Sequence, residues 1–453
     1  MRLRLVLPRG GRGAGFRGLA ALAGAALALL LAAGCGGGDD DARSPERPAT
    51  TQQASQVAPA TTATPAPTAP APVVLATGIT ESNPQLLWDR AARPVVAPGF
   101  DIWRDRLLAL KPRFIRVPVY WSQLQPDPAQ PAYLAHAADG CLRGLGPCGE
   151  SSGIADQLAA IASLQKAGLG VPEVEIVIAG VPSWAAAPAS GCERSDAAPR
   201  SRPISAQGLT AYQALIGQLL ALATQQGATV KYLSPWNEPN HPAFVSPQRA
   251  TCSKDSPTLA AGVYATLVRA AKAALDAAPG DQQLVLGEMA GTTVPSPRRS
   301  SVQEMVAALP DDVACLSQTW SQHDYAQVHP DPGKPDPVAA LERALDAREC
   351  TRGAHIWITE TGVGGDDPGG SRPTGDVALR AQCRAQEKLL LRWAADPRVD
   401  AAFQYTFRED TAYPVGLVDS RLTRVYPTYD LWAAWGAREP SAPAPARPGA
   451  CAA

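Results

Sequence analysis

Two glutamates follow short apolar runs at places where a pair of carboxyl groups could perform nucleophilic and acid–base chemistry. Glu238 lies in the segment Trp236–Asn240, which reads Trp-Asn-Glu-Pro-Asn, and Glu360 follows Thr359. In a glycosidase one carboxylate attacks the anomeric carbon, while the other donates a proton to the leaving oxygen and later activates water. One pocket can hold both protonation states because local surroundings separate the two pKa values. An isolated glutamate is more often a surface acid or a helix cap, so the interpretation depends on its neighbours.

Other polar and aromatic side chains follow the remaining apolar runs. A carboxylate beside Arg116 would stay ionised and therefore nucleophilic. Tryptophans near a sugar site can stack on sugar faces, although each of them could instead belong to the core. Glu288 is either a substrate contact or a structural acid, and His241, close after Glu238, is a candidate substrate contact. The predicted substrate-binding residues are Arg116, Trp121, Trp184, Trp236, Asn237, His323, Tyr325 and Tyr405.

Eight apolar runs, separated by longer amphipathic stretches, supply the elements that must position these residues. They are rich in β-branched residues and lack strict alternation, as expected of strands buried on both faces. The runs are Val73–Ile79, Phe114–Val119, Val174–Ala179, Val230–Pro235, Leu284–Glu288, Thr319–His323, His355–Thr359 and Ala401–Thr406. Strand–helix alternation repeated eight times predicts a parallel (β/α)8 TIM barrel, with functional side chains at the C-terminal strand ends. The alternative is an open doubly wound sheet, although no Gly-rich phosphate loop follows the first run.

Helix boundaries between these runs are also marked in the sequence. Ser205 is a candidate N-cap for a helix that Gly227 closes, and Ser301–Glu304 has the pattern of a capping box. Ser256–Pro257 and Asp336–Pro337 each place a proline where a helix should begin. The helices therefore fall in the gaps that a barrel requires.

The chain resembles glycoside hydrolase clan A over residues 73–436. The resemblance rests on Asn237-Glu238-Pro239 at strand four, Thr359-Glu360 at strand seven, His323-x-Tyr325 at strand six and Arg116 on strand two. It implies that Glu238 is the acid/base, that Glu360 is the nucleophile, that Asn237 contacts the sugar 2-hydroxyl and that Tyr325 orients the nucleophile.

The sequence departs from family 5 of that clan in two places. It lacks the usual histidine near strand three, where Pro182-Ser183-Trp184 is closer to family 39. It also lacks the usual tryptophan after strand eight, where Tyr405 stands. The clan is therefore better supported than any single family.

We expect a retaining glycosidase that cleaves O-glycosidic bonds of a poly- or oligosaccharide by double displacement, with no metal and no organic cofactor. Two alternatives remain open. One is a non-catalytic carbohydrate-binding lipoprotein on the same barrel, and the other is a transglycosylase. Paired carboxylates disfavour the first alternative because binding alone does not need them.

The ends of the chain have compositions of their own. Residues 1–35 hold five arginines, then an apolar run, then Leu31–Cys35, and they predict a lipoprotein signal peptide with Cys35 as the lipidated residue. Residues 36–72 are rich in Thr, Ala and Pro and predict a disordered linker, and 437–453 predict a disordered tail. One catalytic domain, 73–436, lies between them. We expect an exported protein, either lipid-anchored to the membrane and facing outward or secreted.

Charge and cysteine content limit the partners. Five of the 41 basic residues precede residue 36, while all 42 acidic residues follow it, so the mature chain is mildly acidic and has no nucleic-acid footprint. Eight cysteines follow Cys35, and export makes disulfides the expected state. The pairs Cys141–Cys148 and Cys192–Cys252 are predicted, no Cys-x-x-Cys zinc pattern occurs, and we expect a monomer.

Overall fold

The computed structural model describes residues 75–87, 99–134, 153–167, 172–364, 371–411, 413–439 and 442–452. All the described residues belong to one compact unit. The expected signal peptide, Cys35, the linker and the Cys141–Cys148 pair lie outside the described residues. They remain predictions.

Nine strands form a single sheet, and every pair of neighbours in it is parallel. The strands are β1 (Ala76–Thr80), β2 (Phe114–Tyr120), β3 (Glu173–Ala179), β4 (Val230–Ser234), β5 (Gln283–Leu284), β6 (Leu286–Ala290), β7 (Thr319–His323), β8 (His355–Thr361) and β9 (Val399–Tyr405). The first and last strands pair with each other along the whole length of β1.

The sheet closes into a barrel because two of the nine strands are consecutive pieces of one. Only Val285 separates β5 from β6, and β5 pairs with β4 while β6 pairs with β7. Together they occupy the fifth of eight strand positions. The prediction of a parallel (β/α)8 barrel is confirmed, and the open doubly wound sheet is excluded.

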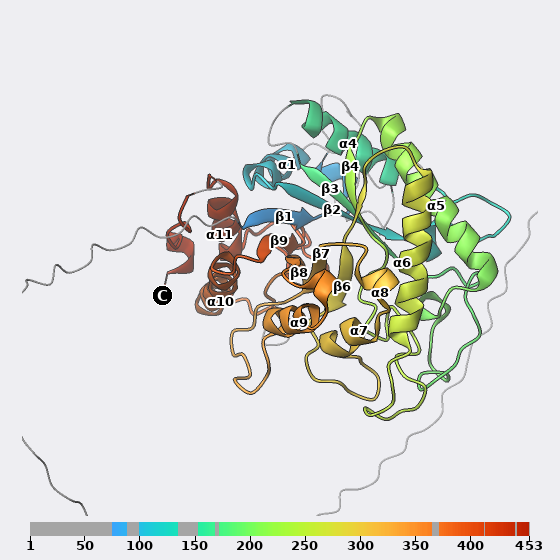
Figure 1. The fold of residues 1–453 in the computed structure, drawn as a ribbon. Helices are drawn as coiled ribbons and strands as arrows, with labels where there is room; N and C mark the ends of the chain where they lie inside the picture. The colour runs from blue at the N-terminus through green and yellow to red at the C-terminus, as the bar shows by residue number, and fades with distance from the viewer. Residues whose placement is uncertain are drawn as a thin grey trace, which may run out of the picture. The chain divides into compact units, whose positions relative to one another are not determined.

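Helices connect consecutive strands and lie outside the sheet (Figure 1). The α-helices are α1 (Phe100–Ala109), α2 (Trp121–Leu124), α4 (Ile154–Ala167), α5 (Ala206–Gln226), α6 (Ala260–Ala277), α7 (Val302–Ala308), α8 (Asp311–Ala314), α9 (Pro337–Asp346), α10 (Asp376–Ala394) and α11 (Pro427–Gly436). Short 3-10 turns are η1 (Pro84–Leu86), η2 (Pro199–Ser201), η3 (Glu349–Thr351) and η4 (Gly449–Cys451). Among the described residues, none of the helices is both long enough and apolar enough to cross a membrane.

Most of the helix ends follow the capping pattern of the sequence. Ser205 accepts a hydrogen bond from the Gly208 amide, and the capping box of Ser301 with Glu304 is complete. The start predicted at Ser256–Pro257 is wrong, because α6 begins at Ala260. The Ser256 carbonyl instead accepts a hydrogen bond from Arg249, so this residue belongs to the preceding loop.

The barrel interior has an aromatic layer and, next to it, a charged layer. Phe114, Trp357 and Phe403 pack ring against ring, with centroids 4.8–5.9 Å apart. Two residues further along β2, Arg116 points to the same interior face, because side chains alternate along a strand. The aromatic layer fills one part of the barrel and leaves the charged layer between it and the C-terminal strand ends.

The C-terminal segment differs from the expectation of a disordered tail over 437–453. Residues 442–452 pack beside α10 and α11, and Cys451 is fully buried and bonded to Cys383 on α10 (Figure 1). The arginine following α11, Arg438, donates a hydrogen bond of 2.6 Å to the carbonyl of Leu75, just before β1. A composition rich in Ala and Pro did not prevent packing, because one disulfide anchors the segment.

Candidate active site

The two glutamates singled out in the sequence lie at the C-terminal ends of their strands. Glu360 is within β8, and Glu238 comes four residues after the end of β4. The Glu238 backbone has a φ of +39°, a left-handed conformation that is strained for a residue with a side chain. Its amide donates a hydrogen bond of 2.8 Å to the carbonyl of Glu288, which has a φ of +48° itself. This hydrogen bond links two positions that both have a left-handed backbone.

Glu360 is held at both carboxylate oxygens. Arg116 Nη1 donates to Oε1 at 2.8 Å, and the Tyr325 hydroxyl donates to Oε2 at 2.6 Å. Burial, followed by the charge of Glu360, raises the pKa of Tyr325 well above its ordinary value, so the phenol stays neutral and remains a donor. These two donors orient the carboxylate and compensate its charge.

His323, the last residue of β7, lies between three carboxylates. Its Nδ1 is 2.9 Å from Glu238 Oε1 and 3.3 Å from Glu360 Oε2, and its Nε2 is 3.2 Å from Glu288 Oε2. Burial alone would lower the pKa of His323, but the charge of Glu360 and the hydrogen bonds to Glu238 and Glu288 raise it to about 10. The ring is therefore an imidazolium that donates from both nitrogens at neutral pH.

The proton on His323 has a direct effect on Glu238. Burial would raise the pKa of Glu238, but the hydrogen bond from His323 and its charge outweigh burial and hold this pKa below the ordinary value. In the ligand-free site Glu238 is therefore ionised. The resemblance implies an acid that carries its own proton, whereas here the nearest proton is on His323 Nδ1, one hydrogen bond away.

Beneath these groups Arg116 organises a dry charged layer. Its Nη2 donates to Glu288 Oε2 at 2.5 Å and to Asn237 Oδ1 at 2.8 Å. Glu288 has no solvent exposure, and although burial would raise its pKa, Arg116 and His323 hold the pKa far below the ordinary value. The burial of Glu288 supports its interpretation as a structural acid rather than as a substrate contact.

The carboxyl groups of Glu238 and Glu360 are close neighbours. One oxygen of each lies within 4.8 Å of the other, with a His323 nitrogen within the same distance of both. Retaining glycosidases hold their two carboxyls about 5–5.5 Å apart, whereas inverting enzymes hold them about 6.5–9.5 Å apart.

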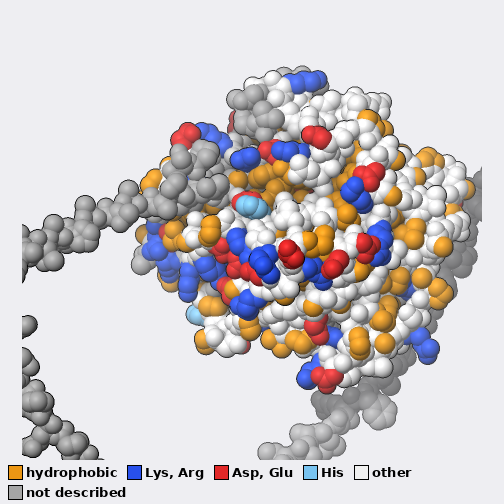
Figure 2. Space-filling model, viewed as in Figure 1, with side chains coloured by type: hydrophobic (Ala, Val, Ile, Leu, Met, Phe, Trp, Pro, Cys, Tyr) orange, Lys and Arg blue, Asp and Glu red, His pale blue; other side chains and the backbone are white. Residues whose placement is uncertain are grey.

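A pocket of about 1030 Å³ opens over these side chains. Glu238 and Glu360 lie in its wall with Asn237, His323 and Tyr325, and Tyr405 joins them from the end of β9. Tyr413, which the sequence analysis did not identify, stacks edge-on against Tyr325 and Tyr405, with centroids 5.1 and 6.0 Å away. It comes from the loop after β9, where no strand-end pattern marks it. In Figure 2 basic and acidic side chains alternate across the middle of the face shown, so no field of a single sign covers that face.

The tryptophans predicted to bind substrate do not line this pocket. Trp121 and Trp236 have at most 1% exposure, so neither ring can stack on a sugar. Trp184 is half-buried, packs edge-on against Trp121 at 5.7 Å and donates to the Gln125 carbonyl. The substrate-binding prediction is corrected for Trp121 and Trp236, because their rings fill the space between the barrel and its helices.

The pocket continues beyond the glutamates to the first turn of α9 and to one face of α10. There Arg392 forms ion pairs with Asp324, at 2.9 Å, and with Asp336. Burial raises the pKa of Asp324 to about 7 against the lowering effect of Arg392. This second group of charges was not identified in the sequence, although Asp324 lies between the two residues of the His-x-Tyr motif.

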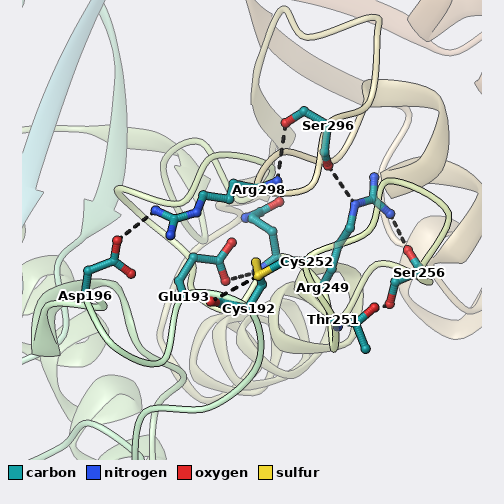
Figure 3. The surroundings of a disulfide bond; sticks show 10 residues. Cys192, Glu193, Asp196, Arg249, Thr251, Cys252, Ser256, Ser296 and Arg298 are labelled. Carbon is teal, nitrogen blue, oxygen red and sulfur yellow. Dashed lines mark hydrogen bonds and ion pairs between the residues drawn. A yellow bond between two sulfur atoms is a disulfide. The ribbon is translucent and has the colours of Figure 1, made fainter.

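A disulfide braces the loops on the Glu238 side of the barrel. Cys192 and Cys252 are bonded with their Cα atoms 4.8 Å apart, which confirms the predicted pair (Figure 3). Around it Arg298 points toward Asp196, and Arg249 toward Ser296 and Ser256. Two further disulfides, Cys315–Cys350 and Cys383–Cys451, were not predicted.

Comparisons with known proteins give distant likenesses only. The sequence matches no known family and no curated protein. A family 39 glycoside hydrolase from Bacteroides cellulosilyticus superposes with a TM-score of 0.46 at 14% identity, covering 80% of this chain and 64% of that protein. SrfJ from Salmonella typhimurium gives 0.48 at 10%, covering 80% and 74%, and a GH10 structure from Paenibacillus barcinonensis gives 0.47 at 13%, covering 80% and 94%. No residue role follows from likenesses this distant.

Proposed function

We propose that this chain is a retaining glycoside hydrolase in which Glu360 is the nucleophile and Glu238 the acid/base. One observation carries the proposal. Glu360 is held by Arg116 and Tyr325 at the wall of a large pocket, with one of its oxygens within 4.8 Å of an oxygen of Glu238. That spacing suits double displacement, because no room is left for a water molecule between a base and the opposite face of the sugar.

In the first step an oxygen of Glu360 attacks the anomeric carbon, and the bond from that carbon to the leaving oxygen breaks. The leaving oxygen takes a proton through Glu238, and His323 Nδ1 is the source that can refill Glu238. In the second step Glu238 accepts a proton from water, and the hydroxide oxygen displaces Glu360 from the sugar.

Asn237 is placed to contact the substrate. Its Oδ1 accepts from Arg116 at 2.8 Å, which fixes the orientation of the amide and leaves Nδ2 as the donor on the pocket side. A sugar hydroxyl beside the scissile bond is the natural acceptor, in agreement with the role that the clan A resemblance implies.

The nucleophile is tested with Glu360→Ala. We expect loss of turnover on aryl glycosides and its return on addition of azide, with a glycosyl azide of inverted configuration as the product. Glu439→Ala, at an exposed position after α11, is the control and should hydrolyse like the parent. Unchanged turnover in Glu360→Ala would contradict the assignment.

The acid/base is tested with Glu238→Ala. General acid catalysis contributes about 10²–10⁴-fold, so substrates with poor leaving groups should lose that much, whereas activated aryl glycosides should lose far less at the first step. Equal losses on both substrate types would contradict the role of Glu238.

Chromatography of the products made at high sugar concentration would distinguish hydrolysis from transglycosylation.

A further inference from the structure

One acid in the charged layer takes no part in the proposed chemistry. Glu175 lies in β3, has no solvent exposure and does not line the pocket. It is the register partner of Arg116 in β2, so both side chains enter the barrel at the same level. Its Oε1 is 2.7 Å from the Ser234 hydroxyl, and its Oε2 has no hydrogen-bond partner.

The contacts of Ser234 indicate where a proton lies. The Ser234 hydroxyl is 2.7 Å from Glu175 Oε1 and 3.3 Å from the carbonyl of Val285, but it has only one hydrogen to donate. Both contacts are hydrogen bonds only if Glu175 donates to Ser234 and Ser234 donates to Val285. A neutral Glu175 completes that chain, whereas an ionised one leaves the Val285 contact without a proton.

The charges of the layer lead to the same conclusion. Two cations, Arg116 and His323, face the carboxylates of Glu238, Glu288 and Glu360 directly. Those donors of Arg116 and His323 that have partners are used by these three carboxylates and by Asn237, none is placed on Glu175, and Arg116 Nε has no hydrogen-bond partner. A fourth charge here would be buried without a hydrogen bond from a cation, which is costly in a dry interior.

We propose that Glu175 is a positioning residue that stays protonated at neutral pH, and that its neutrality leaves Arg116 free to hold Glu360. Ionisation would place a new negative charge opposite Arg116, where it would compete with Glu288 and Glu360 for the guanidinium. The catalytic half of this inference rests on the proposed function, whereas the protonation of Glu175 does not.

The groups that face Glu175 from neighbouring strands support this state. Burial, followed by the charge of Glu288, raises the pKa of Glu175 to about 8, against the lowering effects of Arg116, Ser234 and His323. The ordinary value is 4.5, so the folded protein holds one more proton than the unfolded chain between these two pH values. The contribution of Glu175 to the free energy of unfolding is therefore fully present below pH 4.5 and is lost as the pH rises to about 8.

The protonation is tested with Glu175→Gln, which mimics the neutral acid. Between pH 4.5 and about 8, the ratio of the variant's folding equilibrium constant to that of the parent should rise by up to about tenfold per pH unit. Outside this interval the ratio should stay constant. Urea titrations at several pH values measure the difference.

Glu173→Gln, two residues earlier on the same strand, is the matched control. Burial is outweighed there by hydrogen bonds from Lys231 and other neighbours, which lower the pKa of Glu173. The contribution of Glu173 to stability is therefore present above its ordinary pKa and is lost as the pH falls. This pH dependence is opposite to the one expected for Glu175. The proposal would be overturned if the stability difference between Glu175→Gln and the parent did not change with pH, or if it changed in the direction expected for Glu173→Gln.

Infrared difference spectra of the folded proteins give a second readout that does not depend on unfolding. At neutral pH the carbonyl band of buried protonated carboxyls should be stronger in the parent than in Glu175→Gln, by the contribution of one carboxyl, because Asp324 with its pKa of about 7 contributes to both proteins. If the parent-minus-variant spectrum contained no such band, Glu175 would not hold the proton.

The catalytic half is tested by kcat/KM against pH on a neutral aryl glycoside. The parent should lose activity through a titration near pH 8 that Glu175→Gln lacks, while at pH 6 the two should agree within about threefold. The same alkaline titration in both proteins would overturn the positioning role alone. Absence of glycosidase activity in the parent would instead contradict the proposed function and leave the stability and infrared results standing.

Discussion

His323 couples the two glutamates of the site through its ring. It donates to Glu238 and Glu288 and lies 3.3 Å from Glu360, so its charge acts on both groups that we propose take part in catalysis. Because the pKa of His323 is about 10, that charge is constant over the neutral range. The residue therefore acts as a fixed cation in the ligand-free site.

Removing this cation should move the pH profile in a definite direction. In His323→Gln the pKa of Glu238 should rise, because the interaction that lowers it is gone. The pKa of Glu175 should rise as well, because the charge of His323 also lowers it, and the alkaline limb of kcat/KM near pH 8 should therefore shift to higher pH. We expect kcat to fall about 10–100-fold for the loss of a charge-assisted hydrogen bond. His355→Gln, at an exposed position paired with Asp400, is the control. A limb that stays in place or moves to lower pH would contradict the coupling.

The structure brings the predicted polar residues together but leaves Trp121 and Trp236 away from the pocket. Glu238, Glu360, Arg116 and Tyr325 were identified because strand ends of a parallel barrel converge on one face. Trp121 and Trp236 follow strands in the same way, but they turn into the core. Spacing along a chain does not show which way a ring points once the strand has ended.

At the scale of elements, most strand positions could be predicted but their breaks could not. The run Leu284–Glu288 was read as one strand, whereas Val285 separates β5 from β6 and Glu288 takes a left-handed conformation. Glu288 contacts Arg116 and His323, which come from other strands. Long-range contacts of this kind leave no periodic pattern in the sequence.

Alanine substitutions at two glycines, Gly436 in α11 and Gly217 in α5, should have opposite effects on stability. A Cβ on Gly436 would lie 1.7 Å from the Leu110 carbonyl oxygen, so Gly436→Ala should force the helices apart and destabilise the fold by about 1–3 kcal/mol. Gly217, exposed within α5, has nothing within 4 Å, and Gly217→Ala should stabilise by about 0.5–1 kcal/mol. Urea unfolding measures both, and a stable Gly436→Ala protein would contradict the close approach.

At the scale of the whole molecule, the Cys383–Cys451 disulfide joins the C-terminal segment to the barrel. Cys451→Ser should lower the free energy of unfolding by about 2–4 kcal/mol, because the bond closes a loop of 68 residues in the unfolded chain. Activity under native conditions should change little, since neither cysteine lines the pocket. Thermal melts with and without reductant check this result. An unchanged melting temperature would show that the segment does not depend on the bond.

Anchoring is a separate prediction about residues outside the described part of the chain. If Cys35 is acylated after signal cleavage, Cys35→Ser should move the protein from the membrane fraction to the medium, because a single change removes the attachment site. Cell fractionation with detection of the barrel gives the answer. Membrane retention of the variant would count against the lipoprotein reading.

The hydrogen bond from Arg438 to the Leu75 carbonyl brings the start and the finish of the barrel segment together. Since β1 also pairs with β9, closure of the sheet does not depend on where along the ring of strands the polypeptide begins. A circular permutant, with the segment after Arg438 linked to Leu75 and new termini in an exposed loop, should therefore reach the same barrel. The barrel requires a particular order of the strands around the ring, and this order is the same whichever strand comes first in the chain.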